Sequence, residues 1–376
     1  MRSTRAVALT GAFAVVALAG CGTATPTESS GGAIAVSASD DACKVARTSA
    51  DAGTLTFEVT NKGNRVTEFY LYAEGDRIMG EVENITPGLT RRLIVEVSDS
   101  GKYQTACKPG MQGKGIRGEF TVTGDAKKAT DADSQLAAAT ASYKQYVNAQ
   151  VVALVDKTKE FTSAVKAGDV EKAKALYPVA RIYWERIEPV AESFGDIDPK
   201  VDNREDGVEA GQSFTGFHRL EKDLWVSGLQ PDSSAIADQL QSDIEDLATR
   251  AKTVELTPLQ LANGAKELLD EVATGKITGE EDRYSHTDLW DFRSNVDGSQ
   301  AAINALRPVI QERDAALLST LDEKFAAVDA VLEKYRVGDG FKLYTELTDA
   351  DIKGLSEAVD ALGEPISQVS EVVAGK

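Results

Sequence analysis

The sequence predicts a chain built of two folded parts, an N-terminal β-sandwich followed by an all-α helical bundle. Between about residues 33 and 124, apolar and polar residues alternate, which is typical of half-buried strands. From about residue 135 to the end, apolar residues instead recur every three or four positions, as in amphipathic helices. A length of 376 residues with 42% hydrophobic residues is sufficient for two domains with separate cores.

The strand pattern is clearest over residues 54–60, where Leu55, Phe57 and Val59 fall on one face. Turn-forming residues at 61–64, 74–76 and 87–88 separate this segment from further alternating segments. Short strands with frequent turns predict a Greek-key β-sandwich over residues 33–124. The other residues expected on the buried faces are Phe69, Leu71, Leu93, Val95, Val97, Phe120 and Val122.

Residues 125–134 are polar and lose the strand pattern, so we expect a linker there and a helical bundle over residues 135–376. Gly168 ends the first helical segment, and Asp169 is expected to cap a helix over residues 170–194. Thr257, Pro258 and Gln260 combine an N-cap, a proline in the first turn and a capping box. Residues 348–351 repeat this logic for the last helix.

The N-terminus has the features of a secretory signal. Arg2 and Arg5 precede an apolar run over residues 6–19, which is too short to span a bilayer. The sequence then reads Leu-Ala-Gly-Cys, which resembles a bacterial lipobox with lipidation at Cys21. We therefore expect a lipoprotein signal peptide over residues 1–20 and a flexible tether over residues 21–32. The mature protein would be lipid-anchored to the cell membrane and extracytoplasmic, on the periplasmic or cell-surface side.

The formal net charge of −19 argues against a nucleic-acid partner, because phosphate binding needs clustered lysine and arginine. An acidic surface attracts cations, although solvated helix faces account equally for many Asp and Glu residues.

Two cysteines remain once Cys21 is assigned to lipid, and they allow two interpretations. Outside the cytoplasm, Cys43 and Cys107 can form a disulfide. Alternatively, they can form a soft copper or iron site with Met111 and a carboxylate such as Glu68 or Glu81. These interpretations exclude each other, because a disulfide removes the thiolates. Residues 102–111 resemble the metal loop of cupredoxins, but this domain has no histidine, so we do not expect a blue-copper centre.

His218, one of only two histidines in the chain, lies three residues before Glu221, so both side chains would share one helix face. This pair is either half of a metal site or a structural histidine whose tautomer Glu221 fixes. Glu185, Glu188 and Glu192 would form an acidic stripe on the helix predicted over residues 170–194. Such a stripe requires solvent or a cation, and helices with acidic pairs can close around a metal.

Two polar stretches at helix boundaries add weaker candidates. Residues 194–202 end at Asp202, and residues 280–291 contain His286, which we consider a minor candidate ligand. Oxygen-rich ligation with one imidazole suits iron, manganese or zinc rather than copper(I).

Three segments together resemble the EfeO family of iron-uptake lipoproteins, which join a cupredoxin-like domain to an imelysin-like helical domain. They are residues 216–222 (GFHRLEK), 184–192 (WERIEPVAE) and 285–292 (SHTDLWDF). The resemblance implies iron, ferrous or ferric, bound by the family's His-x-x-Glu motif and its acidic partners. It also implies delivery to a membrane permease of the EfeU type, often with a haem peroxidase of the EfeB type. The implied ligands are His218, Glu221, Glu185, Glu188 and Asp202, with Glu281 and Asp288 as further candidates.

The expected function is therefore iron binding and delivery rather than catalysis, with copper or a second iron as options for the cupredoxin-like domain. A metallopeptidase of the imelysin-like type and a copper carrier are the alternatives. A zinc peptidase usually needs a second histidine beside the motif. Positions 219 and 222 hold Arg219 and Lys222 instead, which disfavours a peptidase.

Overall fold

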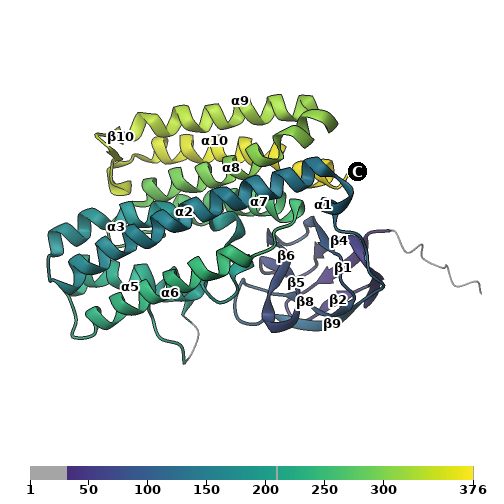
Figure 1. Cartoon of the computed structure of the whole chain (residues 1–376), viewed down its shortest axis with the longest axis horizontal. Helices are drawn as coiled ribbons and strands as arrows, with labels where there is room; N and C mark the ends of the chain where they lie inside the picture. Colours follow the sequence, from purple (N-terminus) through teal and green to yellow (C-terminus); the bar gives the residue numbers. More distant parts are fainter. Residues whose placement is uncertain (1–31, 209–210, 376) are drawn as a thin grey trace, which may run out of the picture. The chain divides into compact units, whose positions relative to one another are not determined.

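The computed structural model describes residues 32–208 and 211–375, and the chain from Ala33 onward forms one compact unit (Figure 1). The predicted signal peptide, Cys21 and nearly all of the predicted tether lie outside the described residues. None of the helices described is both long enough and apolar enough to cross a bilayer.

The N-terminal part is a sandwich of two sheets, with strand orders β2-β1-β4-β7 and β3-β9-β8-β5-β6. β1 pairs with β4 in parallel, as β3 does with β9, and the other neighbours are antiparallel. All apolar residues expected on the inner faces are buried, and the rings of Phe57 and Phe69 lie 5.2 Å apart at the centre. The strands are β1 (Ile34–Ala38), β2 (Cys43–Val45), β3 (Ser49–Asp51), β4 (Gly53–Asn61), β5 (Thr67–Tyr72), β6 (Ile78–Ile85), β7 (Thr90–Val97), β8 (Gly101–Cys107) and β9 (Ile116–Thr123), with a 3-10 turn η1 (Glu74–Asp76).

Cys43 and Cys107 form a disulfide that joins β2 to the end of β8, with their Cα atoms 5.5 Å apart. In this state neither sulfur is a thiolate, so a soft metal site built on both cysteines is closed. Met111 is 44% exposed, and Glu68 accepts a hydrogen bond from the Tyr70 hydroxyl at 2.9 Å. Of the two interpretations of the cysteines, the structure therefore contains the disulfide.

The helical part begins within the segment expected to be a linker, because α1 (Ala129–Ala132) precedes α2, which starts at Ser134. Asp133 caps α2 by accepting from the amide of Gln135 at 2.8 Å. The longer helices are α2 (Ser134–Lys166), α3 (Val170–Glu185), α6 (Ser233–Thr253), α7 (Pro258–Thr274), α8 (Asp288–Arg313), α9 (Ala315–Leu332) and α10 (Asp349–Ile366). Shorter elements are η2 (Glu188–Phe194), α4 (Asp198–Val201), η3 (Glu205–Gly207), α5 (Gly216–Lys222), the π-helical η4 (Asp223–Ser227), η5 (Lys276–Thr278), η6 (Glu333–Tyr335), β10 (Arg336–Val337), β11 (Gly340–Phe341), η7 (Tyr344–Glu346) and α11 (Val369–Val373).

The helix starts expected from capping residues are confirmed. Asp169 accepts from the amide of Lys172, and both predicted capping boxes are formed, at Thr257 and at Thr348. These caps depend only on local sequence, which is why they could be located without the fold.

The continuous helix expected over residues 170–194 is wrong. α3 ends at Glu185, and the 3-10 segment η2 starts at Glu188. Pro189 has no N–H to donate to the Glu185 carbonyl, which instead accepts from Nδ2 of Asn295 at 3.2 Å. The three glutamates therefore do not form one stripe: Glu185 and Glu188 flank the break, and Glu192 lies on η2.

β6 of the sandwich packs against α7 of the helical part (Figure 1). β6 also contacts η2, and β7 contacts α7. The side-chain amide of Asn263 donates to the Ile94 carbonyl at 2.9 Å, and Ile94 packs with the helical core. Position 264 must be glycine for this close packing, because a Cβ there would lie 1.7 Å from the Pro189 carbonyl oxygen. The two sequence-predicted parts are thus joined directly along β6, η2 and α7.

The disulfide should stabilise the sandwich measurably. Its cysteines are 64 residues apart, so removing the cross-link frees a long loop in the unfolded chain. We expect Cys43→Ser/Cys107→Ser to lower the free energy of unfolding by about 2–5 kcal/mol. Hydrogen exchange of β1–β9 amides in urea measures this directly, with reduced wild-type protein as the matched control. Equal protection in the variant, in the reduced wild type and in the oxidised wild type would contradict a stabilising cross-link.

Candidate metal centre

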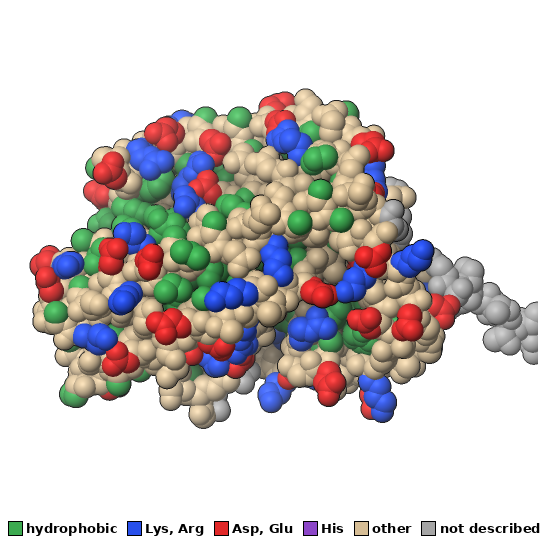
Figure 2. Space-filling view, viewed as in Figure 1, with side chains coloured by type: hydrophobic (Ala, Val, Ile, Leu, Met, Phe, Trp, Pro, Cys, Tyr) green, Lys and Arg blue, Asp and Glu red, His purple; other side chains and the backbone are tan. Residues whose placement is uncertain are grey.

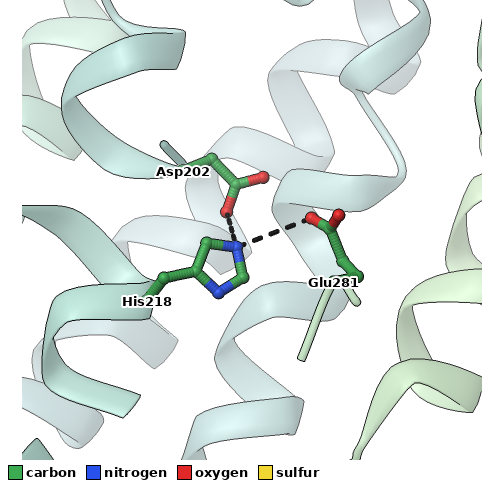
Figure 3. A group of neighbouring side chains, drawn as sticks. All are labelled: Asp202, His218 and Glu281. Carbon is green, nitrogen blue, oxygen red and sulfur yellow. Dashed lines mark ion pairs between the residues drawn. The ribbon is translucent and has the colours of Figure 1, made fainter. Parts of the chain in front are cut away.

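His218 is 2% exposed and points its imidazole between two acidic side chains from different segments (Figure 3). Its Nε2 lies 3.4 Å from Oδ1 of Asp202 and 3.5 Å from Oε1 of Glu281. Among the described residues this nitrogen has no hydrogen-bond partner. Buried polar atoms almost always find partners, so an unpartnered ring nitrogen facing carboxylates indicates a position for a ligand.

The other ring nitrogen is held in place. Nδ1 of His218 lies 3.1 Å from Oε2 of Glu221 and 3.3 Å from the Tyr177 hydroxyl. Oε1 of Glu221 accepts from the backbone amides of Tyr284 at 3.0 Å and Ser285 at 2.7 Å. Glu221 therefore connects α5 to the loop before α8 and fixes the ring so that Nε2 faces Asp202 and Glu281.

A close backbone contact brings α5 to this position. Gly216 has φ +80°, and a Cβ there would lie 2.3 Å from the Val201 carbonyl oxygen. Only glycine allows both the left-handed conformation and this approach. α5 therefore packs directly beside α4, whose C-terminal cap is Asp202.

Arg181 is fully buried at the centre of the acidic group. Its Nε lies 3.0 Å from Oδ2 of Asp291, and one terminal nitrogen lies 3.3 Å from Oε1 of Glu281. The guanidinium also donates to Glu185 and Asp202. A buried guanidinium needs such partners, because its desolvation is otherwise very unfavourable.

Lys276 supplies a second buried cation from η5 and is 2% exposed. Its Nζ lies 2.9 Å from Glu185 and 2.8 Å from Glu188, and 3.9 Å from Glu281. Nδ2 of Asn295 donates to the same two carboxylates at 2.8 and 2.6 Å. The ammonium therefore lies between the carboxylates of Glu185 and Glu188.

Carboxylates outnumber cations in this buried group. Arg181, Lys276 and a protonated His218 are the only cationic side chains with ion pairs to it from buried positions in the described chain. An excess of buried negative charge favours an additional cation. The carboxylates are Glu185, Glu188, Asp202, Glu221, Glu281, Asp282 and Asp291.

The electrostatics divide these groups into two classes. Burial opposes ionisation of Asp202, but Arg181 and His218 lower its pKa well below the usual value. Glu281 behaves similarly, since Lys276 and His218 lower its pKa against the effect of burial. In contrast, burial raises the pKa of Asp282 to about 6 and, together with Asp282, that of Asp288 to about 8. The carboxylates facing Nε2 are thus ionised, whereas Asp282 and Asp288 take up protons at a higher pH than an ordinary aspartate does.

The structure brings most of the sequence-predicted residues together. His218 forms one possible metal-holding group with Asp202 and Glu281, and another with Glu221 and Asp282. Glu185 and Glu188 lie beside the first group and share Arg181 and Lys276 with it.

Two weaker candidates have other surroundings. Asp288 accepts from the amide of Asp282 at 3.1 Å and so stabilises the loop that carries Glu281. His286 donates its backbone amide to the Asp282 carbonyl at 2.7 Å, and its ring is in neither of the possible metal groups of the described residues.

The two buried cations, their acidic partners Asp282 and Asp291, and Asn295 were not predicted from the sequence. Arg181 lies four residues before Glu185, a helical spacing that could have indicated an ion pair. Asp282 directly follows Glu281 and could have been included with it. Lys276 lies on η5, whereas Asp291 and Asn295 lie on α8, and no local pattern links them to Glu185 and Glu188.

Comparison with known proteins agrees with this architecture. The profile described as imelysin matches residues 139–369, and the profile for a cupredoxin-like domain matches residues 11–122. The protein named iron uptake system component EfeO of Escherichia coli O157:H7 is 42% identical over 346 residues, covering 90% of this chain and 91% of that protein. The chain belongs to the EfeO family.

The proteins of the same name from Escherichia coli K12 and Shigella flexneri are each 41% identical over 346 residues, with the same coverage of 90% and 91%. The expected EfeO resemblance, the cupredoxin-like sandwich and the imelysin-like helical domain are therefore confirmed. Membership in the EfeO family supports a role in iron uptake.

Lys276→Met tests whether the ammonium of Lys276 competes with a metal ion for Glu185 and Glu188. Removing one partner of a buried ion pair destabilises a protein by about 3–5 kcal/mol, so the metal-free variant should unfold at lower denaturant concentration. Added ferrous iron should restore more stability to the variant than to the wild type, because no ammonium competes for Glu185 and Glu188.

Lys353→Met is the matched control, since Lys353 pairs with Glu357 on the exposed surface of α10. This variant should change stability by only about 0–1 kcal/mol and leave the response to iron unchanged. An equal response to iron in both variants would refute the role assigned to Lys276.

Proposed function

We propose that the protein captures iron in the centre around His218 and delivers it to a membrane permease. The observation that carries this proposal is the buried, unpartnered Nε2 of His218 between the carboxylates of Asp202 and Glu281. Imidazole with several carboxylates suits ferrous or ferric iron. Iron is the cargo here rather than a catalytic cofactor.

In this proposal Glu221 orients the imidazole rather than binding the metal first. A metal-binding histidine usually donates its second N–H to a carboxylate, as Nδ1 of His218 can to Glu221. Nε2, Asp202 and Glu281 then supply the first donors. Glu185 and Glu188 complete the set when Lys276 moves away from them.

Release of iron follows from competition between iron and the cations of the centre for the same donors. Burial and Arg181 oppose protonation of His218, but the nearby carboxylates of Asp202, Glu221 and Glu281 raise its pKa well above the usual value. Without iron, a proton on His218 and the ammonium of Lys276 therefore neutralise part of the centre's negative charge. The same two cations can displace iron when a partner offers other ligands.

The partners belong to the proposal as well. Delivery would involve a permease of the EfeU type, with a haem peroxidase of the EfeB type as a further component. Lipid on Cys21 would keep the protein at the extracytoplasmic face of the membrane.

A peptidase receives no support from the geometry. Glu221 already accepts two backbone amides in addition to its contact with the imidazole. Arg219 pairs with Asp232, and Lys222 pairs with Glu205, so neither neighbour of the motif supplies a metal donor. We therefore propose a binding role without catalysis.

The two histidines provide a matched pair of variants. His218→Asn should weaken ferrous iron binding by at least about tenfold, which corresponds to 1.4 kcal/mol. Glu221→Gln should weaken it by about 10–100-fold, the usual effect of a group that orients a ligand. His286→Asn should leave affinity unchanged, and asparagine tolerates the positive φ of 61° at this position. Anaerobic calorimetric titration measures all three, and equal affinities for the two histidine variants would refute the proposal.

The metal-free protein should become less stable as pH rises from about 5 to about 8. The folded pKa of Asp282 is about 6 and that of Asp288 about 8, both above the values expected in the unfolded chain. The folded chain therefore binds more protons in this range, so its stability decreases as pH increases through these pKa values. Bound iron should offset this loss. Melting curves at several pH values should show a gap between iron-loaded and metal-free protein that widens with pH, and a constant gap would contradict the expectation.

A further inference from the structure

A second acidic cavity lies where the sandwich packs against the helical part. Its volume is about 300 Å³, and residues of β6, η2 and α7 line it. It is separate from the space between His218 and Asp202, neither of which lines it. Two glutamates line this cavity and also pair with Lys276 of the metal centre, Glu188 at 2.8 Å and Glu271 at 4.0 Å.

Glu81 is the most informative side chain of this cavity. It lies on β6, is only 7% exposed, and its Oε2 has no hydrogen-bond partner in the described part of the chain. A buried carboxylate oxygen without a partner is strongly unfavourable. A cation in the cavity would remove this penalty.

Nearly all the charged side chains that line the cavity are acidic. Arg204 is the only basic side chain among the described lining residues, and it already pairs with Glu281 at 3.0 Å. On the face shown in Figure 2, by contrast, acidic and basic side chains are interspersed. The carboxylates of the cavity besides Glu188 are Glu81, Glu83, Glu192, Asp198, Glu267 and Glu271.

The pKa values of the cavity's carboxylates reflect this crowding of like charges. Burial raises the pKa of Glu192 to about 7, despite the attraction of Lys108. Burial also raises the pKa of Glu267 to about 8, although Lys266 opposes this. A divalent cation would replace protons that the carboxylates otherwise keep.

We propose that this cavity binds a hydrated divalent metal ion through carboxylates of both domains and passes it to the buried centre by way of Glu188. The donors are all oxygens, which hard divalent ions prefer. Among the described residues, the carboxylate oxygens here do not form a group within 4.8 Å of one another, so the ion keeps part of its water shell. The relay step rests on the function proposed above, whereas binding in the cavity does not.

Glu188 gives the relay its physical basis. Its carboxylate borders the cavity and also binds the ammonium of Lys276 at 2.8 Å. An ion that reaches Glu188 from the cavity competes with Lys276 for the same oxygens. Displacement of that ammonium frees the carboxylate of Glu185, and the ion then reaches the donors around His218.

Manganese(II) is a suitable probe, because its paramagnetic resonance signal separates free from bound ions. Wild-type protein should bind two ions, one in the cavity and one in the centre. Glu81→Gln/Glu267→Gln should bind one, and its centre should fill with ferrous iron at least about tenfold more slowly. His218→Asn/Asp202→Asn should lose the other ion and keep the cavity site.

Glu74→Gln/Glu119→Gln is the matched control, because both glutamates are exposed and the change in net charge is the same. It should bind two ions at the wild-type rate. Circular dichroism melting of each variant, and the single change Glu192→Gln, distinguish loss of a site from loss of folding.

Two ions in the Glu81/Glu267 variant, with wild-type affinity and loading rate, would overturn the cavity site. One ion in that variant with an unchanged loading rate would overturn the relay alone. Two ions in the His218/Asp202 variant would instead refute the proposed function and leave the cavity site standing.

Discussion

The structure around His218 depends on one buried electrostatic arrangement, in which Arg181 and Lys276 neutralise part of an excess of carboxylates. Each of these cations is buried, and each contacts acidic residues from at least two segments of the chain. The desolvation of so many charges is offset only if every cation keeps several partners. The helices that supply these partners are thereby fixed relative to one another.

On the function proposed above, this arrangement also explains how a folded, metal-free protein can hold its donors in place before a metal binds. Without counter-ions, the carboxylates would repel one another or take up protons. A metal can displace the ammonium of Lys276, which sits on a flexible stem, and can replace the proton on the imidazole of His218. Arg181 remains charged and keeps Asp202 ionised beside Nε2. Capture and release then require exchange of cations rather than refolding.

The sequence predicted much of this molecule, and the failures have physical causes. The inner faces of the sandwich and the capping residues follow from local periodicity, so Phe57, Phe69 and Thr257 were placed correctly. The helix through Glu188 was not, because Pro189 removed one backbone bond and Asn295, more than a hundred residues later, replaced it. The pair His218 and Glu221 was evident from its spacing, but the division of roles between them depends on amides at Tyr284 and Ser285. Lys276 was missed because only the tertiary fold brings it to Glu185 and Glu188.

X-ray absorption at the iron edge of the loaded protein tests the central claim most directly. The account predicts oxygen and nitrogen donors with the outer-shell scattering of one imidazole, and loss of that imidazole feature in His218→Asn. Donors of oxygen alone in the wild type, or an imidazole feature that persists in His218→Asn, would contradict it.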